Sequence, residues 1–382
     1  MKLVYAATLA VFLTSLARPM SGATPPEELK VDDSLGPPAR LSDGTLIAFA
    51  VSGNAMLHRR QSTDGGRTWS EPYYAFTYPL GEEPVDGGAY TLVDRANCIH
   101  VFRIKYHKLA TPREPTAGRS EVLHAMSADS GVTWSKPKPI NFGHSYTGAL
   151  NSCIQLGNGR LLLALSYATQ NIIQRAHQVE FRVATAYSDS GGGDWHPGAD
   201  DLSVPFGPLE GHPGAIEPIL MELKDGRVWM LIRTQTTRFY EAFSSDGGRT
   251  WTKPRASPFL APNSPGGFLR LSDGRIALCW NAFAHYSDGV SGDKLGFRKY
   301  LYVALSSDDG ITWTPPRCVA PVRDRDADRS RAQYPFLCEN KDGDILVYYT
   351  RFRSKSGTEH DDTATRELVR VSPAWITSTE RP

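Results

Sequence analysis

The stretch SSDGGRTW at residues 244–251 is one of five related copies of the pattern Ser-x-Asp-x-Gly-x-x-Trp in this chain. The other copies are STDGGRTW at 62–69, SADSGVTW at 127–134, SSDDGITW at 306–313 and a degenerate SDSGGGDW at 188–195, in which Ser190 replaces Asp. The third positions of successive copies lie 65, 61, 56 and 62 residues apart. That period is too long for a helical-pair repeat and too short for a domain. It suits one four-stranded antiparallel sheet, the unit of a β-propeller blade.

A second repeat consists of an Asp-Gly or Asn-Gly pair between two apolar runs, which is a strong signal for a tight β-hairpin. Its copies are LSDG at 41–44, LGNG at 156–159, LKDG at 223–226, LSDG at 271–274, NKDG at 340–343 and a degraded VDRA at 93–96. Six hairpins predict six blades. We therefore expect an all-β chain folded as a six-bladed β-propeller of four-stranded antiparallel blades.

The Asp-containing repeat is interpreted as the turn between the third and fourth strands of each blade. The Ser and Asp side chains can accept hydrogen bonds from turn amides, Gly permits a positive φ, and Trp packs beneath the turn. We therefore expect a structural role for these copies and no active site there. The segment before Asp32 is expected to close the ring beside the last blade, whose strands are predicted within 334–350 and 366–371.

The N-terminus is typical of a secretory signal, with Lys2, an apolar core at 3–16 and small residues at 21–23. The chain is therefore divided into a signal peptide at 1–23 and a propeller domain at 24–382, and a secreted or periplasmic location is expected. The apolar core is short for a membrane span, and no later segment is apolar enough to be one.

Charge and cysteine content narrow the possible partners. The formal net charge of +1 does not favour nucleic acid or a polyanion as a partner. The five cysteines lack metal-ligand spacing, and three of them, Cys153, Cys279 and Cys338, fall in strand-like runs as expected for buried thiols. One disulfide is possible in an exported protein. We expect no metal, no cofactor and a monomer.

Counting along each hairpin predicts which side chains share one face. Glu217 lies eight residues before the Asp of its turn and Arg233 lies seven after the Gly, so both fall at the end opposite the turn. Tyr334 has the position of Glu217 in the last blade, and Arg298 precedes Ser306 by eight residues. Four functional groups from three blades should therefore meet near the pore.

At this point the chain resembles the sialidase (neuraminidase) superfamily, in particular its bacterial-type members. The Asp-containing repeat, called the Asp box or BNR repeat in that family, carries the resemblance over nearly all of the chain after residue 23. The segments GAIEPILMELKDGRVWMLIRT at 214–234 and YPFLCENKDGDILVYYT at 334–350 are similar to blade signatures of the family.

The resemblance implies a chemistry for these residues. Sialidases bind the substrate carboxylate with three arginines, which suit an anion by bidentate hydrogen bonding. A tyrosine attacks the anomeric carbon, a glutamate takes its proton, and an aspartate acts as the acid. By this resemblance Tyr334 is the nucleophile, Glu217 the base, and Arg233 and Arg298 two of the three arginines. The partners implied are sialylated or other acidic glycans.

Two parts of the family pattern are missing near the N-terminus. No Arg-Ile-Pro element precedes the first hairpin, and Arg40 is the nearest arginine to that place. No carboxylate stands just before the first Asp box, so a replacement acid is sought in the loop at 73–88. That loop and the starts of inner strands supply the remaining candidates, which are Glu82, Glu83 and Asp86 as acids and His144, Tyr146 and His212 as further substrate-binding or acid–base groups.

Three functions follow from these patterns. The first is an exported, retaining exo-sialidase-like glycoside hydrolase that uses Tyr334. The second is a lyase or hydrolase acting on another uronic acid-containing glycan on the same scaffold, which the missing acid and first arginine favour. The third is a glycan-binding propeller without catalysis, since a fold does not imply a function.

Overall fold

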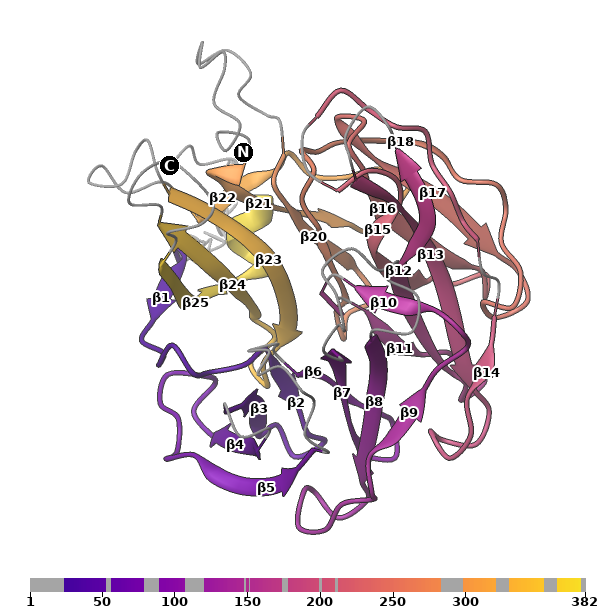
Figure 1. Ribbon diagram of the computed structural model, residues 1–382. Coiled ribbons are helices and arrows are strands. Elements are labelled where there is room, and N and C mark those ends of the chain that lie inside the picture. Colours follow the sequence, from indigo (N-terminus) through magenta and orange to yellow (C-terminus); the bar gives the residue numbers. More distant parts are fainter. Residues whose placement is uncertain are drawn as a thin grey trace, which may run out of the picture.

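A computed structural model describes the chain at 24–52, 56–78, 89–106, 120–147, 149–150, 152–173, 178–198, 201–209, 212–282, 298–320, 330–353 and 363–378. Six antiparallel sheets are arranged around a central axis in sequence order, so the predicted six-bladed β-propeller is confirmed (Figure 1). The expected signal peptide lies outside the described residues. In the described part, no helix has the length and apolarity that a membrane crossing requires.

The first three blades follow one another along the chain. Blade 1 contains β2 (Pro38–Arg40), β3 (Leu46–Val51), β4 (Met56–Ser62) and β5 (Tyr73–Thr77). Blade 2 contains β6 (Tyr90–Val93), β7 (Ile99–Tyr106), β8 (Ser120–Ser127) and β9 (Lys138–Ile140). Blade 3 contains β10 (Ser145–Thr147), β11 (Cys153–Gln155), β12 (Leu161–Ile173), β13 (Gln178–Ser188) and β14 (His196–Pro197). Its inner strand is split, because β10 and β11 both pair with β12.

The last three blades continue the ring. Blade 4 contains β15 (Ile216–Glu222), β16 (Val228–Arg233), β17 (Arg238–Ser244) and β18 (Arg255–Leu260). Blade 5 contains β19 (Gly267–Arg270), β20 (Ile276–Trp280), β21 (Leu301–Ser306) and β22 (Arg317–Ala320). Blade 6 contains β23 (Ser330–Glu339), β24 (Ile345–Arg353), β25 (Thr363–Val371) and, as its outer strand, β1 (Glu27–Leu29). A short helix, α1 (Pro373–Thr377), follows β25.

The ring is closed by the N-terminal strand, as the sequence predicted. Strand β1 pairs antiparallel with β25, with Glu27 opposite Arg370 and Leu29 opposite Leu368 (Figure 1). The sixth sheet is therefore built from the two ends of the described chain.

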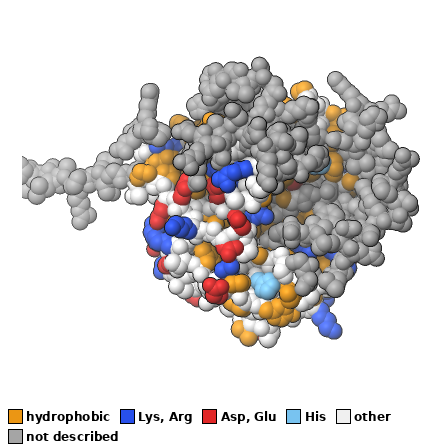
Figure 2. All heavy atoms as spheres, turned by 60° about the vertical axis from the view of Figure 1, so that its left-hand side comes forward, with side chains coloured by type: hydrophobic (Ala, Val, Ile, Leu, Met, Phe, Trp, Pro, Cys, Tyr) orange, Lys and Arg blue, Asp and Glu red, His pale blue; other side chains and the backbone are white. Residues whose placement is uncertain are grey.

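Buried apolar side chains fill the spaces between neighbouring blades and form the core. Val228 of blade 4 and Leu162 of blade 3 belong to one such cluster, and Ala277 of blade 5 and Val347 of blade 6 belong to another. Alternate residues of each middle strand face opposite neighbours, because side chains alternate across a strand. The surface in Figure 2 carries acidic and basic side chains interspersed, in keeping with a formal net charge of +1.

Each complete Asp box forms the predicted turn between the third and fourth strands. In the copy after β17, Asp246 accepts from the Thr250 amide at 2.9 Å and from the Thr250 hydroxyl at 2.6 Å. The Ser244 hydroxyl accepts from the Gly248 amide at 2.8 Å, and the Trp251 indole donates to the Gly248 carbonyl at 3.2 Å. The box therefore satisfies its own polar groups, which supports the structural role expected of it.

The degraded hairpin of blade 2 differs from its prediction by one position. The Asn97 amide donates to the Asp94 carbonyl at 2.9 Å, just as the Gly44 amide donates to the Leu41 carbonyl at 3.0 Å. The equivalent turn is therefore 94–97 and not 93–96. Asn97 replaces the glycine with a φ of +64°, a region that Asn tolerates better than most residues.

All five cysteines are free thiols, so the disulfide considered from the sequence does not form. Cys153, Cys279 and Cys338 are buried, as predicted.

Candidate active site

Two inner strands carry the same bulge at the same place. In β15 the register shifts between Ile216 and Ile219, and in β23 it shifts between Gln333 and Phe336. The first residue inside each bulge is Glu217 in blade 4 and Tyr334 in blade 6, so the predicted equivalence of these two positions is confirmed. A bulge interrupts the alternation of a strand and redirects a side chain.

Both residues have an uncommon backbone conformation. The φ of Glu217 is +50° and that of Tyr334 is +60°, and each residue precedes a proline. A residue before proline ordinarily takes an extended conformation, and a non-glycine residue at positive φ is strained by about 1–3 kcal/mol. Two blades thus hold one polar side chain each at a strained bulge, an arrangement that clusters at functional sites.

Glu217 and Arg233 form a buried ion pair on neighbouring strands. Nη1 of Arg233 donates to Oε2 of Glu217, and the two side chains are only 2% and 3% exposed. The other carboxylate oxygen of Glu217 accepts from the Ala149 amide at 3.0 Å. Burial disfavours the charged guanidinium, but Glu217 and then Tyr334 outweigh it and raise the pKa of Arg233. Arg233 therefore stays a cation although it is buried.

Tyr334 reaches the same pair from blade 6. Its hydroxyl is hydrogen-bonded to Arg233, and its pKa is raised by the charge of Glu217 and then by burial, with Arg233 and Arg298 acting in the opposite direction. The phenol is therefore held neutral beside a carboxylate. A neutral nucleophile with a base beside it is the combination that allows attack without repelling an anionic substrate.

Asn263 connects the arginines of blades 4 and 5. Its side-chain oxygen accepts from Nε of Arg233 at 2.7 Å, and its backbone carbonyl accepts from Nη2 of Arg298. Nη1 of Arg298 donates to Oε1 of Gln333, the neighbour of Tyr334, at 2.7 Å. Asn263 is 3% exposed and Gln333 is 4% exposed, so both positions are fixed by the surrounding fold.

The four residues counted along the hairpins therefore lie together, whereas Arg40 does not join them. Nη1 of Arg40 donates to the backbone carbonyl of Asn340 at 2.8 Å, and its Nη2 lies 3.5 Å from the carboxylate of Glu339. Asn340 begins the hairpin turn of blade 6, so Arg40 lies at the turn face, opposite the site. The reason is its place beside the blade 1 turn, and the substrate-binding role of Arg40 stays a prediction that this placement does not favour.

The remaining sequence candidates have different outcomes. Tyr146 is 1% exposed and belongs to the core between blades 2 and 3, a placement that does not favour its candidate role in substrate binding. His144 is partly exposed and stacks on Tyr167 with ring centroids 3.9 Å apart. His212 is exposed, and its backbone carbonyl accepts from Asn263 at 3.4 Å. His144 and His212 thus stay predictions.

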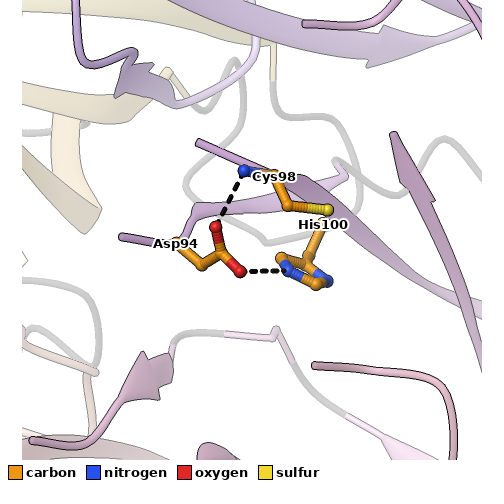
Figure 3. A group of neighbouring side chains, drawn as sticks. All are labelled: Asp94, Cys98 and His100. Carbon is orange, nitrogen blue, oxygen red and sulfur yellow. Dashed lines mark hydrogen bonds and ion pairs between the residues drawn. The ribbon is translucent and has the colours of Figure 1, made fainter. Parts of the chain in front are cut away.

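The acid candidates Glu82, Glu83 and Asp86 lie outside the described residues. Sequence reasoning missed the roles of Asn263 and Gln333, which act through backbone and side-chain contacts that hairpin counting does not reveal. It also missed a usable signal, the Glu-Pro and Tyr-Pro dipeptides at equivalent strand positions. A third feature that it missed is a group of Asp94, Cys98 and His100 on the turn side of blade 2 (Figure 3).

Fold and site together define a β-propeller of the Asp-box class. Residues 99–347 match the BNR repeat-like domain family, so this chain belongs to that family, within the sialidase and BNR-repeat superfamily. A sialidase from Micromonospora viridifaciens is 27% identical over 312 residues. The matched region spans 73% of this chain and 43% of that sialidase, so the chain covers less than half of this curated relative.

Solved structures share the fold at low sequence identity. A protein of unknown function from Dyadobacter fermentans has a TM-score of 0.63 at 17% identity, covering 91% of this chain and 98% of its own. Trypanosoma rangeli sialidase has a TM-score of 0.59 at 16% identity, covering 89% of this chain and 55% of its own. NanB sialidase from Streptococcus pneumoniae, in complex with 2-[(3-chlorobenzyl)ammonio]ethanesulfonate, has a TM-score of 0.59 at 16% identity, covering 89% of this chain and 68% of its own. At these identities the likeness concerns the fold alone.

Proposed function

We propose that this chain is an exported exo-sialidase-like glycoside hydrolase that releases a terminal acidic sugar of the sialic acid class from glycoconjugates. The observation that carries the proposal is the contact of Tyr334, Glu217 and Arg233 at matched bulges of two blades. Membership of the BNR repeat-like family supports it. The chemistry below is built from the residues of this chain.

In the proposed reaction the Tyr334 oxygen forms a bond to the anomeric carbon as its proton passes to Glu217. The bond from that carbon to the leaving oxygen breaks, and the leaving oxygen takes a proton from a carboxyl group, for which Glu82, Glu83 and Asp86 are the candidates. Water then attacks the anomeric carbon and gives a proton to the carboxylate left by the acid. The bond to the tyrosine oxygen breaks, and Glu217 returns its proton to Tyr334. Two displacements retain the anomeric configuration.

Arg233 and Arg298 are proposed to bind the sugar carboxylate. Asn263 and Gln333 hold both guanidinium groups from the side, which fixes their planes before the substrate arrives. Bidentate guanidinium groups suit a carboxylate, and prior fixing lowers the entropic cost of binding. Arg233 also forms the ion pair with Glu217. One side chain therefore connects the proposed base with the proposed carboxylate-binding site.

The test compares wild-type protein with Tyr334→Phe for release of fluorophore from a 4-methylumbelliferyl sialoside. Tyr334→Phe removes one oxygen and is expected to reduce kcat by about 10⁴-fold or more. Tyr349→Phe is the matched control in the same blade, because the Tyr349 hydroxyl binds Glu367 at 2.5 Å and takes no part in the proposed site. Full activity in Tyr334→Phe would contradict the nucleophile.

A folded wild type without release would instead favour one of the two alternatives. Incubation with a uronic acid-containing polysaccharide then separates them, because a lyase gives an unsaturated product that absorbs in the ultraviolet. Binding on a glycan array without turnover of any substrate would support a glycan-binding propeller. Export is tested in the same expression host by following the removal of the N-terminal segment.

A further inference from the structure

The hairpin of blade 2 replaces apolar residues with polar ones. The Asp94 amide donates to the Cys98 carbonyl at 3.0 Å, and the same bond joins Leu41 to Thr45 at 2.9 Å in blade 1. Leucine also stands at this first turn position in blades 3, 4 and 5, at Leu156, Leu223 and Leu271. His100, two residues beyond Cys98, matches the buried Ile47 of blade 1. Blade 2 thus places a carboxylate where blades 1, 3, 4 and 5 have a leucine, and an imidazole where blade 1 has a buried isoleucine.

Asp94, Cys98 and His100 bring three metal-ligating atoms together. One ligand atom from each residue lies within 4.8 Å of the other two. Nε2 of His100 is 3.4 Å from Oδ2 of Asp94, and the other carboxylate oxygen is held by the Cys98 amide at 2.8 Å. Figure 3 shows the carboxylate facing the imidazole, with the sulfur beside the same ring. The side chain of His100 is fully buried and that of Asp94 is 7% exposed.

A second histidine orients the first. Nε2 of His124 lies 3.1 Å from Nδ1 of His100, and the two rings are stacked with centroids 5.3 Å apart. The Trp195 indole donates to Nδ1 of His124 at 3.3 Å. In the four complete Asp boxes the corresponding Trp donates to a glycine carbonyl instead, for example Trp251 to Gly248 at 3.2 Å. The degenerate box therefore directs its Trp at the histidine pair.

We propose that Asp94, Cys98 and His100 form a binding site for one divalent transition-metal ion of the Zn²⁺ type, which ties the β6–β7 turn to the start of β7. Thiolate, imidazole and carboxylate are ligands that Zn²⁺ accepts together. A separation of 3.4 Å between nitrogen and oxygen fits two bonds of about 2.0–2.1 Å near the tetrahedral angle. A ligand histidine commonly has a hydrogen-bonding partner on its other nitrogen, a place that His124 occupies here.

The hydrogen bond from Trp195 should weaken metal binding, because it favours tautomers of the two histidines that place a proton on Nε2 of His100. Because its indole donates to Nδ1 of His124, the proton of His124 belongs on Nε2 and points at His100, whose own proton then belongs on Nε2 and points at Asp94. A metal on Nε2 of His100 displaces that proton and reverses both tautomers. The N–H of His124 then faces the N–H of Trp195, two donors without an acceptor. Removing the indole donor should therefore strengthen metal binding.

The experiment uses metal-stripped, tag-free protein and measures Zn²⁺ by elemental analysis and titration calorimetry, and Co²⁺ by absorption. We expect one Zn²⁺ per chain, a thiolate-to-Co²⁺ absorption band in the near ultraviolet, and a higher Tm with Zn²⁺ present. Cys98→Ser and Asp94→Asn should each weaken binding by about tenfold or more. Trp195→Phe should strengthen it by about tenfold.

Cys318→Ser is the control, since Cys318 is a free thiol elsewhere and should leave binding unchanged. A wild-type protein without stoichiometric Zn²⁺ and without the Co²⁺ thiolate band overturns the proposal, whatever the folding of the variants. Binding that is equal in wild type, Cys98→Ser and Asp94→Asn overturns it as well. Sialoside turnover is not a readout, so failure of the proposed hydrolase function would leave this result intact.

Discussion

The two faces of the propeller use the same repeating blade for opposite purposes. On the turn face, Asp246 and its counterparts accept hydrogen bonds from the backbone amide and the side-chain hydroxyl of the Thr in their own boxes. On the other face, Glu217 and Tyr334 interrupt their strands with bulges at φ of +50° and +60°. Positive φ also occurs in turns of the turn face, for example at Asn97, but among the described residues only Glu217 and Tyr334 combine it with a following proline. The comparison teaches that departures from the repeat, more than the repeat itself, mark the positions with chemistry.

Among the variants below, Glu217→Gln should cause the largest loss of sialoside turnover. It removes the proposed base with almost no change of shape, so sialoside turnover should fall by about 10²–10⁴-fold. The matched control is Glu241→Gln in the same blade, because Glu241 is a buried carboxylate paired with Arg255 at 2.9 Å, away from the site. Glu241→Gln should keep turnover within about twofold of wild type. Equal losses of turnover in Glu217→Gln and Glu241→Gln would contradict the role of Glu217 as the base.

Asn263→Ala tests whether the two arginines need their lateral support. Without the side-chain oxygen at 2.7 Å from Arg233, the guanidinium loses its fixed plane, and kcat/KM should fall by about 10²-fold, mainly through KM. Asn263→Asp keeps an acceptor and should recover part of the loss. Asn340→Ala alters a buried asparagine on the turn face and should change Tm without changing KM. An unaltered KM in Asn263→Ala would show that the arginines are fixed by other groups.

The degenerate Asp box allows a stability test on the turn face. Ser190 takes the place of Asp, and Asp194 takes the place of the Thr that binds that Asp in the complete boxes. Ser190→Asp alone should lower Tm, because it sets two carboxylates together. Ser190→Asp combined with Asp194→Thr should restore the box and stabilise the fold by about 0.5–1.5 kcal/mol. Denaturant unfolding measures both, and equal effects of the single and double variants would contradict the box geometry.

The smallest expected effect is an acid dependence from the complete boxes. Hydrogen bonds from Thr133 and Thr312 lower the pKa of Asp129 and Asp308 to about 2, from an ordinary 3.8. A lowered folded-state pKa contributes stability above pH 3.8 that is lost as the pH falls toward 2. Tm should therefore fall in that interval, and less steeply in Asp308→Asn than in wild type. Parallel Tm profiles for the two proteins would contradict this contribution.

Much of the fold was predictable because both repeats report local turn chemistry. Asp-Gly pairs and Asp boxes need particular hydrogen bonds, so they fix the ends of strands, and counting from them brought Glu217, Arg233, Arg298 and Tyr334 together. The degraded turn of blade 2 was misplaced by one residue because the apolar Val93 was aligned with the leucine that begins the other turns. Its backbone hydrogen bond aligns it with leucine instead.

Two candidate residues lie apart from the four that cluster, for a shared physical reason. Arg40 has the right charge but lies beside a turn, and Tyr146 has a suitable ring but faces the core between two blades. Arg40 was a candidate as the arginine nearest the first hairpin, and Tyr146 as a residue near the start of an inner strand. The turn and the alternation along the strand decided where the two side chains lie. The bulges were not predicted because one extra residue in a strand leaves no change in composition. Asn263 was not assigned its role because contacts between blades connect distant parts of the chain.

Pairing of β1 with β25 has a consequence for the order of folding during synthesis. Glu27 emerges from the ribosome early, but its partner Arg370 belongs to the last strand of the chain. At about 5–20 residues per second, translation between the two takes on the order of tens of seconds. Middle blades can form in that interval, whereas the sixth sheet waits until β25 has been synthesised. A nascent chain therefore carries an open ring with an unpaired edge until β25 emerges and pairs with β1.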